Sequence, residues 1–313
     1  MAVPVYVFTG FLESGKTLFI QDTLEDKRFN AGEKTLLLVC EEGEEEYYPS
    51  EFSGKNVDMV TFDDVEDLTE NRLNTLAEKY KPARVLIEYN GMWLMQNLYD
   101  SLPEDWVPYQ NMLFFDSSTF ISYNSNMRSL VVDKLSDADV IVFNRIEKGF
   151  DTMQLHKIVR GSTRRANILY EYKDGTLVPD EIEDPLPFDC DAASFTVEDK
   201  DFALFYRDLT EDMKKYKGKT VTFKALAAID DKFPKNTFAV GRHIMTCCAD
   251  DIQYCGLVAK SDNTSNISNS CWYMITATID IKFSGLYRKK GPIFNIKSVE
   301  PATEPDDPVA TFY

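Results

Sequence analysis

The first half of the chain alternates short, continuous apolar runs with longer segments in which apolar residues recur at helical spacing. A short continuous apolar run is typical of a strand buried on both faces of a parallel sheet. The predicted strands span residues 3–9, 34–40, 57–62, 84–88, 111–116, 138–144 and 167–172, and the predicted helices span residues 17–28 and 65–80. This alternation predicts an α/β fold with a doubly wound parallel sheet, whose functional side chains follow the carboxyl ends of the strands.

The pattern changes after residue 172. Residues 173–191 are rich in acidic side chains and prolines, which is typical of a linker. Beyond the linker, one predicted helix and several alternating apolar–polar segments indicate strands. The helix spans residues 202–216, and the strands span residues 220–229, 237–245, 256–260, 271–283 and 293–298. We therefore predict an α/β domain over residues 1–175, a linker over 176–193, and a small all-β, oligonucleotide/oligosaccharide-binding (OB)-like barrel over 194–313.

The segment between the first predicted strand and its helix reads Gly-Phe-Leu-Glu-Ser-Gly-Lys-Thr, from Gly10 to Thr17. It has the spacing of a phosphate-binding loop (P-loop): Gly, four residues, then Gly-Lys-Ser/Thr. The two glycines let backbone N–H groups curl around an anion, Lys16 can reach the β- and γ-phosphates, and the Thr17 hydroxyl can bind Mg²⁺. The predicted phosphate-binding residues are Gly10, Glu13, Ser14, Gly15, Lys16, Thr17 and Leu18.

Two further strand ends supply candidate nucleotide-binding residues. Glu88 can hold Mg²⁺ directly or through water, and Gly91 lets the backbone approach the γ-phosphate. After a later strand, Glu147 can accept two hydrogen bonds from the guanine N1–H and N2–H₂ edge. Asn144 braces this loop, and Arg145 completes the predicted base-binding segment. Adenine lacks that pair of donors, so GTP is favoured, although Glu in place of a shorter Asp leaves ATP open.

The second predicted strand ends at Cys40 and runs into a strongly acidic segment, residues 41–46. Such a charged segment cannot pack in a core, so we expect a loop. Glu41 or Glu42 could orient water or Mg²⁺ there. Cys40 beside these carboxylates could form a weak divalent-metal site, or it could be an ordinary buried cysteine.

Composition narrows the possible functions. The chain has 313 residues and a formal net charge of −18, and the acidic excess lies in residues 1–193. An acidic surface repels phosphate backbones, so we expect no nucleic-acid binding. There is no apolar run of membrane-spanning length and no secretion signal, and six scattered cysteines fit a reducing compartment. We therefore expect a cytoplasmic protein.

A second concentration of chemically reactive side chains lies in the predicted barrel. His243, Cys247, Cys248 and Cys255 are ligand types that zinc prefers, with Asp250 available to complete a site. Adjacent strand cysteines point to opposite faces, so Cys247 and Cys248 cannot easily bind one ion. A zinc site, buried structural cysteines and a redox-active pair all remain open.

The motifs of residues 3–172 resemble those of the CobW-like metallochaperone GTPases, which are relatives of UreG and HypB. The matching pieces are the P-loop, Glu88 with Gly91, Asp116 after the next strand, and the segment from Ala138 to Glu147. The resemblance implies a P-loop GTPase that times the delivery of a transition metal such as Zn²⁺, Co²⁺ or Ni²⁺. The chain departs from this family because residues 41–87 contain no cysteine, so the usual Cys-x-Cys-Cys motif is missing. The predicted barrel also replaces the usual C-terminal domain.

Residues 195–313 resemble the C-terminal domain of YcgQ-type permease subunits. The matching residues are Arg242, Met245, Cys247, Cys248, Asp250, Trp272 and Pro301. This resemblance implies an association with metal-linked membrane partners.

The leading hypothesis is a Mg²⁺-dependent GTPase in which Lys16, Thr17 and Glu88 carry catalysis. No arginine is placed as a finger, so slow turnover is expected. The protein would act as a metallochaperone or regulator of metal homeostasis, with zinc the first candidate metal. The rival hypothesis is a nucleotide-gated scaffold for a membrane permease subunit with little hydrolysis, and a third is an ATP-dependent small-molecule kinase. Candidate partners are guanine nucleotide, a metal-receiving protein, a permease subunit and, by resemblance, a second copy of the chain.

Overall fold

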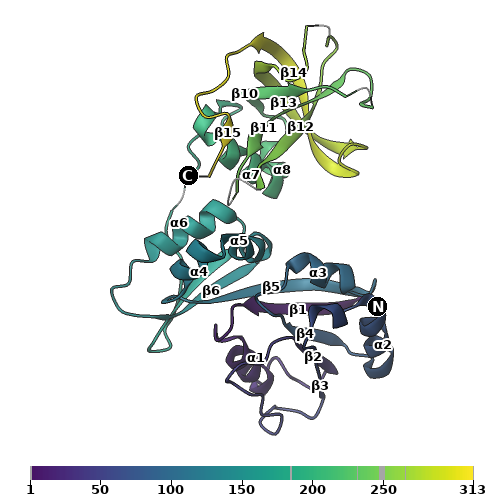
Figure 1. Ribbon diagram of the computed structural model, residues 1–313, viewed down its shortest axis with the longest axis vertical. Helices are drawn as coiled ribbons and strands as arrows, with labels where there is room; N and C mark the ends of the chain where they lie inside the picture. Colours follow the sequence, from purple (N-terminus) through teal and green to yellow (C-terminus); the bar gives the residue numbers. More distant parts are fainter. Residues whose placement is uncertain (1, 184, 231, 247–250, 265, 313) are drawn as a thin grey trace. The chain divides into compact units, whose positions relative to one another are not determined.

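The computed structural model describes residues 2–183, 185–230, 232–246, 251–264 and 266–312. The chain forms two compact units, Met1–Ile182 and Glu183–Tyr313 (Figure 1). Among the described residues, no helix has both the length and the apolar character needed to cross a membrane.

The first unit is built on one sheet with the strand order β3-β2-β4-β1-β5-β6-β7-β8. Its strands are β1 (Val3–Gly10), β2 (Thr35–Val39), β3 (Val57–Thr61), β4 (Arg84–Glu88), β5 (Trp106–Asp116), β6 (Val140–Ile146), β7 (Asn167–Tyr172) and β8 (Leu177–Pro179). Strands β1 to β7 pair in parallel, and β8 runs antiparallel to β7. The α/β parallel fold predicted from the apolar runs is therefore confirmed.

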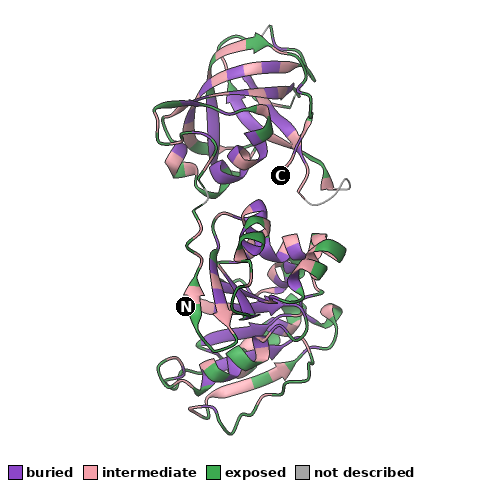
Figure 2. Cartoon of the chain, turned by 90° about the vertical axis from the view of Figure 1, so that its left-hand side faces the viewer, coloured by how far each residue is buried: buried purple, intermediate pink, exposed green. Residues whose placement is uncertain are grey.

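Helices cover both faces of this sheet, which explains why its central strands are continuously apolar. The helices are α1 (Lys16–Glu25), the 3₁₀ turn η1 (Val65–Asp67), α2 (Glu70–Tyr80), α3 (Met95–Ser101), α4 (Phe120–Asn126), α5 (Arg128–Asp137) and α6 (Thr152–Ser162). Ile20 and Leu24 of α1 pack with Phe8 on one face. Val5 and Val7 of β1 belong to a core on the other face, with α2 and α3. Figure 2 shows the central strands of this unit as buried.

The second unit contains a sheet with the order β15-β11-β12-β14-β13-β10-β9 and an additional pairing between β10 and β11. Its strands are β9 (Ser194–Thr196), β10 (Thr220–Ala228), β11 (Thr237–Ile244), β12 (Gln253–Lys260), β13 (Trp272–Ser284), β14 (Lys289–Pro301) and β15 (Val309–Ala310). Its helices are the 3₁₀ turn η2 (Asp199–Asp201), α7 (Phe202–Glu211) and α8 (Met213–Tyr216).

The pairings of β10 to β14 run in a circuit. β10 pairs antiparallel with β11 and β13, β11 pairs antiparallel with β12, β12 pairs in parallel with β14, and β14 pairs antiparallel with β13. Alternate residues of β10, from Val221 to Ala227, are buried and belong to the core of this unit. The segment predicted as a linker, residues 176–193, contains β8, and its Phe188 packs in the same core.

Candidate functional site

The loop between β1 and α1 has the backbone conformation that its two glycines permit. Gly10 has φ of +146°, and a Cβ there would lie 2.3 Å from the backbone oxygen of Phe114. Gly15 caps α1 in the left-handed region, with φ of 91°. Only glycine suits both positions. The N-terminus of α1 points into the space that the loop surrounds, where its N–H groups favour an anion.

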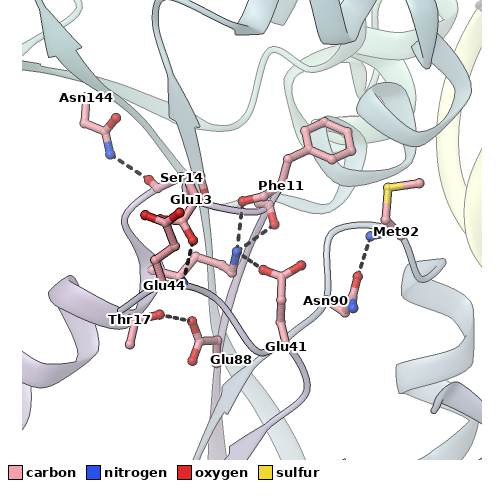
Figure 3. Close-up of polar contacts among 12 residues, drawn as sticks. Phe11, Glu13, Ser14, Thr17, Glu41, Glu44, Glu88, Asn90, Met92 and Asn144 are labelled. Carbon is pink, nitrogen blue, oxygen red and sulfur yellow. Dashed lines mark hydrogen bonds and ion pairs between the residues drawn. The ribbon is translucent and has the colours of Figure 1, made fainter. Parts of the chain in front are cut away.

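Lys16 is buried and folds back across the loop. Its Nζ donates to the backbone oxygens of Gly10 (2.9 Å) and Phe11 (3.0 Å) and to Glu41 Oε2 (2.5 Å) (Figure 3). An ammonium group has three donors, so all of them are used. The ion pair with Glu41 is nearly dry, with 2% and 9% of the two side chains exposed.

Thr17 and Glu88 lie side by side at the same loop. The parallel register of β1 and β4 places Glu88 beside Phe8, just before the loop begins. Thr17 Oγ1 donates to Glu88 Oε1 over 2.6 Å, and Tyr47 Oη donates to Glu88 Oε2 over 2.6 Å. Burial raises the pKa of the Glu88 carboxyl, although hydrogen bonds from Thr17 and Tyr47 and the charge of Lys16 oppose that rise. A hydroxyl next to a carboxylate is the hard-oxygen ligand pair that Mg²⁺ prefers, so these residues fit that ion.

The acidic segment after β2 lies across the loop and is held there by several contacts. Glu44 N donates to Glu13 Oε1 over 2.9 Å, and Tyr48 exchanges backbone hydrogen bonds with the Gln21 amide. Glu42 is exposed. The cavity between this segment and the P-loop is only about 40 Å³, which holds a few water molecules rather than a phosphate chain. A phosphate chain in this cavity would therefore require Glu41, Gly43 and Glu45, which line it, to move.

The end of β6 braces the P-loop from its other side. Asn144 Nδ2 donates to the Ser14 backbone oxygen over 2.6 Å. Arg145, with φ of 57°, donates through Nη1 to the Glu13 backbone oxygen (2.8 Å) and to Asp116 Oδ2 (2.7 Å). The structure therefore brings two residues of the predicted base-binding segment onto the phosphate loop.

Glu147 points elsewhere. Its side chain is 71% exposed and pairs with Lys173 Nζ over 2.5 Å, which lowers the pKa of the Glu147 carboxyl. A cavity of about 300 Å³ beside the P-loop is lined by Phe19, Asp22, Arg145 and Lys173, among others, and Glu147 does not line it. To read a base in this cavity, Glu147 would have to exchange its contact with Lys173.

Cys40 is buried at the end of β2, with 1% of its surface exposed. Burial, with the nearby Glu88 and Glu41 charges, raises the pKa of its thiol. A thiol held in its neutral form is a poor metal ligand. Cys40 lies in the apolar core with Val5 and Leu38, which favours the interpretation as an ordinary buried cysteine.

The structure does not bring His243 and Cys255 together. Cys255 lies opposite Arg242, and His243 lies opposite Tyr254, so the two candidate ligands occupy opposite faces of the β11–β12 pair. Burial raises the pKa of Cys255. Within the described ranges, no three His, Cys, Asp or Glu side chains form a group that could hold a metal ion. Cys247, Cys248 and Asp250 lie outside the described residues.

Tyr47 is the site residue that sequence reasoning missed. Its hydroxyl reaches Glu88 across 41 positions of the chain. No motif marks it, and only its place at the end of an acidic loop next to the P-loop could have drawn attention to it.

Comparison with known proteins supplies a match for the second unit. Residues 180–310 match the family described as DUF1980 C-terminal domain. No curated protein matches the chain.

Several solved structures are similar. The hydrogenase maturation factor HypB from Archaeoglobus fulgidus is 17% identical with a TM-score of 0.38, covering 54% of this chain and 80% of its own. Zinc-bound YjiA GTPase from E. coli is 14% identical with a TM-score of 0.43, covering 85% and 91%. A zinc-bound triple mutant of YjiA gives the same identity and TM-score, covering 86% and 92%. Residues 180–310, in the second unit, are therefore similar to the DUF1980 C-terminal domain, and they follow a parallel α/β unit whose first strand runs into the sequence Gly-x-x-x-x-Gly-Lys-Thr.

Proposed function

We propose that the chain is a Mg²⁺-dependent GTP-binding and GTP-hydrolysing protein of the CobW-like class. The observation that carries this proposal is the convergence of Lys16, Thr17 and Glu88 at one glycine-bounded loop. Asn144 and Arg145 support it, because both hold the backbone of that loop through direct hydrogen bonds.

Each residue has a separate role in the proposed site. Thr17 and Glu88 would hold Mg²⁺, which when bound neutralises charge that develops on the phosphates. Lys16 would exchange the Glu41 carboxylate for phosphate oxygens, because its three donors are already used in the closed loop. Loop N–H groups and Lys16 would then stabilise the γ-phosphate during in-line attack by water.

The base preference rests on the segment after β6. Arg145 lines the 300 Å³ cavity beside the P-loop, and Glu147 would accept from the guanine edge after leaving Lys173. The charge-assisted contact with Lys173 is exposed, so its exchange costs little. GTP is accordingly the proposed nucleotide, with ATP the alternative.

For the second unit we infer an OB-like barrel, because the pairings of β10 to β14 return to their starting strand. A metal function, with zinc the first candidate, would depend on Cys247 and Cys248. The proposed biological role is that of a metallochaperone or a regulator of metal homeostasis.

The alternative is a nucleotide-gated scaffold for a membrane permease subunit. One observation favours it: residues 41–48 close over the P-loop through Glu41, Glu44 and Tyr47, so binding and loop movement must be coupled. A protein of this kind would bind GTP and hydrolyse it very little.

Calorimetric titration with GTP and ATP, each with and without Mg²⁺, tests the proposal. We expect GTP to bind more tightly than ATP, Mg²⁺ to strengthen GTP binding, and Lys16→Ala to weaken it by at least about tenfold, a loss of about 1.4 kcal/mol. Equal affinities for GTP and ATP would remove the base preference. No binding of either nucleotide would remove the nucleotide site itself.

A further inference from the structure

The connected ends of β13 and β14 form a hairpin that extends past the apolar core of the second unit. Along β13, buried and partly exposed side chains alternate as far as Ile279, and every side chain from Asp280 to Ser284 is at least partly exposed. Strand pairing nevertheless continues outward to Ser284 and Lys289 (Figure 1). We call residues 282–290 the hairpin end. These residues continue the strand pairing but have no apolar core of their own.

Two apolar side chains of the hairpin end face solvent. Phe283 is 69% exposed and Leu286 is 38% exposed. Exposed apolar side chains need no explanation when they occur singly, and here two of them lie in the same hairpin end.

The same element carries a cluster of cations. Arg288, Lys289 and Lys290 are all exposed. None of the three makes an ion pair with any residue that the structure describes, whereas Lys282 is paired with Asp280 over 2.6 Å. Phe283 and Lys290 are direct partners in the strand pairing, so an apolar and a cationic side chain share one face.

The hairpin end is fixed in place by Tyr287. Its hydroxyl accepts a hydrogen bond from Val258 N (2.7 Å) and donates to the Pro292 backbone oxygen (3.0 Å). Its ring lies where a Cβ on residue 291 would be, 2.4 Å from the nearest ring atom, so glycine is needed at that position. The turn therefore presents its exposed side chains from a rigid base, which lowers the entropy cost of binding.

We propose that the hairpin end binds membrane surfaces that contain anionic phospholipids. Phe283 and Leu286 would enter the interfacial layer, and Arg288, Lys289 and Lys290 would contact headgroup phosphates. Stable attachment to a membrane surface needs both an apolar and an electrostatic contribution, and this element supplies both. The chain as a whole has a net charge of −18 and is repelled by an anionic surface, so a local cationic element would determine which part makes contact.

A single-stranded nucleic acid is the competing partner for a cationic hairpin on a β unit. It fits the hairpin end less well, because such binding relies on successive aromatic platforms along a positively charged groove. Here the three unpaired cations are consecutive at one end, and one of the two exposed apolar side chains, Leu286, has no aromatic face.

Flotation of the full chain with vesicles tests the proposal. Vesicles of phosphatidylcholine alone are compared with vesicles of phosphatidylcholine mixed with phosphatidylserine. We expect binding only to the mixed vesicles, and binding that weakens as salt is added. The double variants Phe283→Ser/Leu286→Ser and Lys289→Glu/Lys290→Glu should each reduce the bound fraction at least about fivefold.

Matched variants separate a local effect from a general one. Lys232→Glu/Lys235→Glu makes the same charge change at two exposed lysines between β10 and β11, and Ile229→Ser removes an apolar side chain that is 39% exposed. Both should bind mixed vesicles as the unmodified chain does, and all variants should keep its melting temperature. The proposal is overturned if the unmodified chain fails to float, or if the control variants lose as much binding as the hairpin variants. It is also overturned if the hairpin variants lose binding to a single-stranded oligonucleotide while vesicle binding is unchanged.

Discussion

The carboxylate of Glu88 is buried, and each of its oxygens accepts a hydrogen bond from a hydroxyl group, that of Thr17 or that of Tyr47. If Thr17 turns its oxygen to a bound Mg²⁺, Tyr47 is the donor that continues to orient Glu88. A residue that orients a metal ligand in this way typically changes metal affinity by about 10- to 100-fold when it is removed.

Tyr47→Phe should therefore weaken the Mg²⁺ dependence of nucleotide binding and leave the contacts to phosphate unchanged. We expect the Mg²⁺ concentration for half-maximal retention of a fluorescent guanine nucleotide to rise by about tenfold, with nucleotide affinity in the absence of Mg²⁺ unchanged. Tyr48→Phe is the control, because the contacts of Tyr48 with Gln21 use its backbone. Equal Mg²⁺ dependence of the two variants would contradict this role for Tyr47.

The raised pKa of Glu88 has a consequence for stability. A carboxyl whose pKa is higher in the folded than in the unfolded chain binds its proton more tightly when folded. This tighter proton binding stabilises the fold at pH values below the unfolded pKa. The stabilisation is lost as the pH rises through the folded pKa. The burial of this carboxyl therefore lowers the free energy of unfolding at pH values above its folded pKa.

Glu88→Gln should accordingly raise the melting temperature at pH 7, by roughly 2–4 °C for each kcal/mol gained in the free energy of unfolding. The gain in melting temperature should shrink as the pH falls toward the pKa of Glu88 in the unfolded chain. The substitution should also abolish Mg²⁺-dependent nucleotide binding. Glu42→Gln, at an exposed position of the neighbouring loop, is the control and should change neither quantity. A melting temperature for Glu88→Gln below that of the unmodified chain at pH 7 would contradict the argument.

At the scale of single residues, the sequence predicts the site residues that lie in a local sequence motif. Lys16, Thr17 and Asn144 lie in recognisable motifs, and the structure places all three at one loop, joined by Glu88. Tyr47 was missed because no motif marks it, and its contact with Glu88 lies 41 positions away in the chain. The orientation of Glu147 depends on Lys173, which belongs to another segment and carries no motif.

At the scale of elements, the loop after β4 is packed directly on the loop after β1. A Cβ added to Gly91 would lie 2.4 Å from the Gly10 backbone oxygen and 2.8 Å from the Phe11 Cα. Backbone atoms cannot yield as a flexible side chain would, so a side chain at position 91 would force these two loops apart.

Gly91→Ala should therefore push the P-loop out of position. We expect a loss of about 1–3 kcal/mol in the free energy of unfolding, the usual cost of forcing an extra carbon into a packed site, together with a large loss of nucleotide affinity. Gly285→Ala is the matched control, since no atom lies within 4 Å of a Cβ there. Chemical denaturation and nucleotide titration measure the two effects, and equal behaviour of both variants would contradict the packing argument.

The elements themselves were predictable where the pattern was continuous. β2 and β4 are buried at every position, and both lie where their apolar runs predict. The predicted helix at 65–80 is broken instead, because Thr69 caps α2 by accepting a hydrogen bond from Arg72 N. Helix α6 went unpredicted, although Asp151 at its N-cap, with Leu155 and Val159 beyond it, was a usable signal.

At the scale of the whole molecule, each unit has its own apolar core, and the chain separates into residues 1–182 and 183–313. The change from continuous to alternating apolar patterns predicts two such units. The parallel pairing of β12 with β14 could not be predicted, because it joins strands that are not consecutive and leaves no local pattern in either.

Because each unit has its own apolar core, the two functional proposals concern different units. The proposed nucleotide chemistry involves Lys16, Thr17 and Glu88 in the first unit, and the proposed membrane contact involves the hairpin end in the second. Each can therefore be tested in the full chain by a variant that leaves the other untouched.

The central claim is that the P-loop of this chain acts on GTP, and single-turnover hydrolysis tests it most directly. Release of the γ-phosphate from GTP is measured with the full chain in excess over nucleotide, in Mg²⁺, for the unmodified chain and for Lys16→Ala. We predict slow release that requires Mg²⁺ and is reduced at least about 100-fold in the variant, a loss of about 2.7 kcal/mol of transition-state stabilisation. Equal rates for the two proteins would contradict the account.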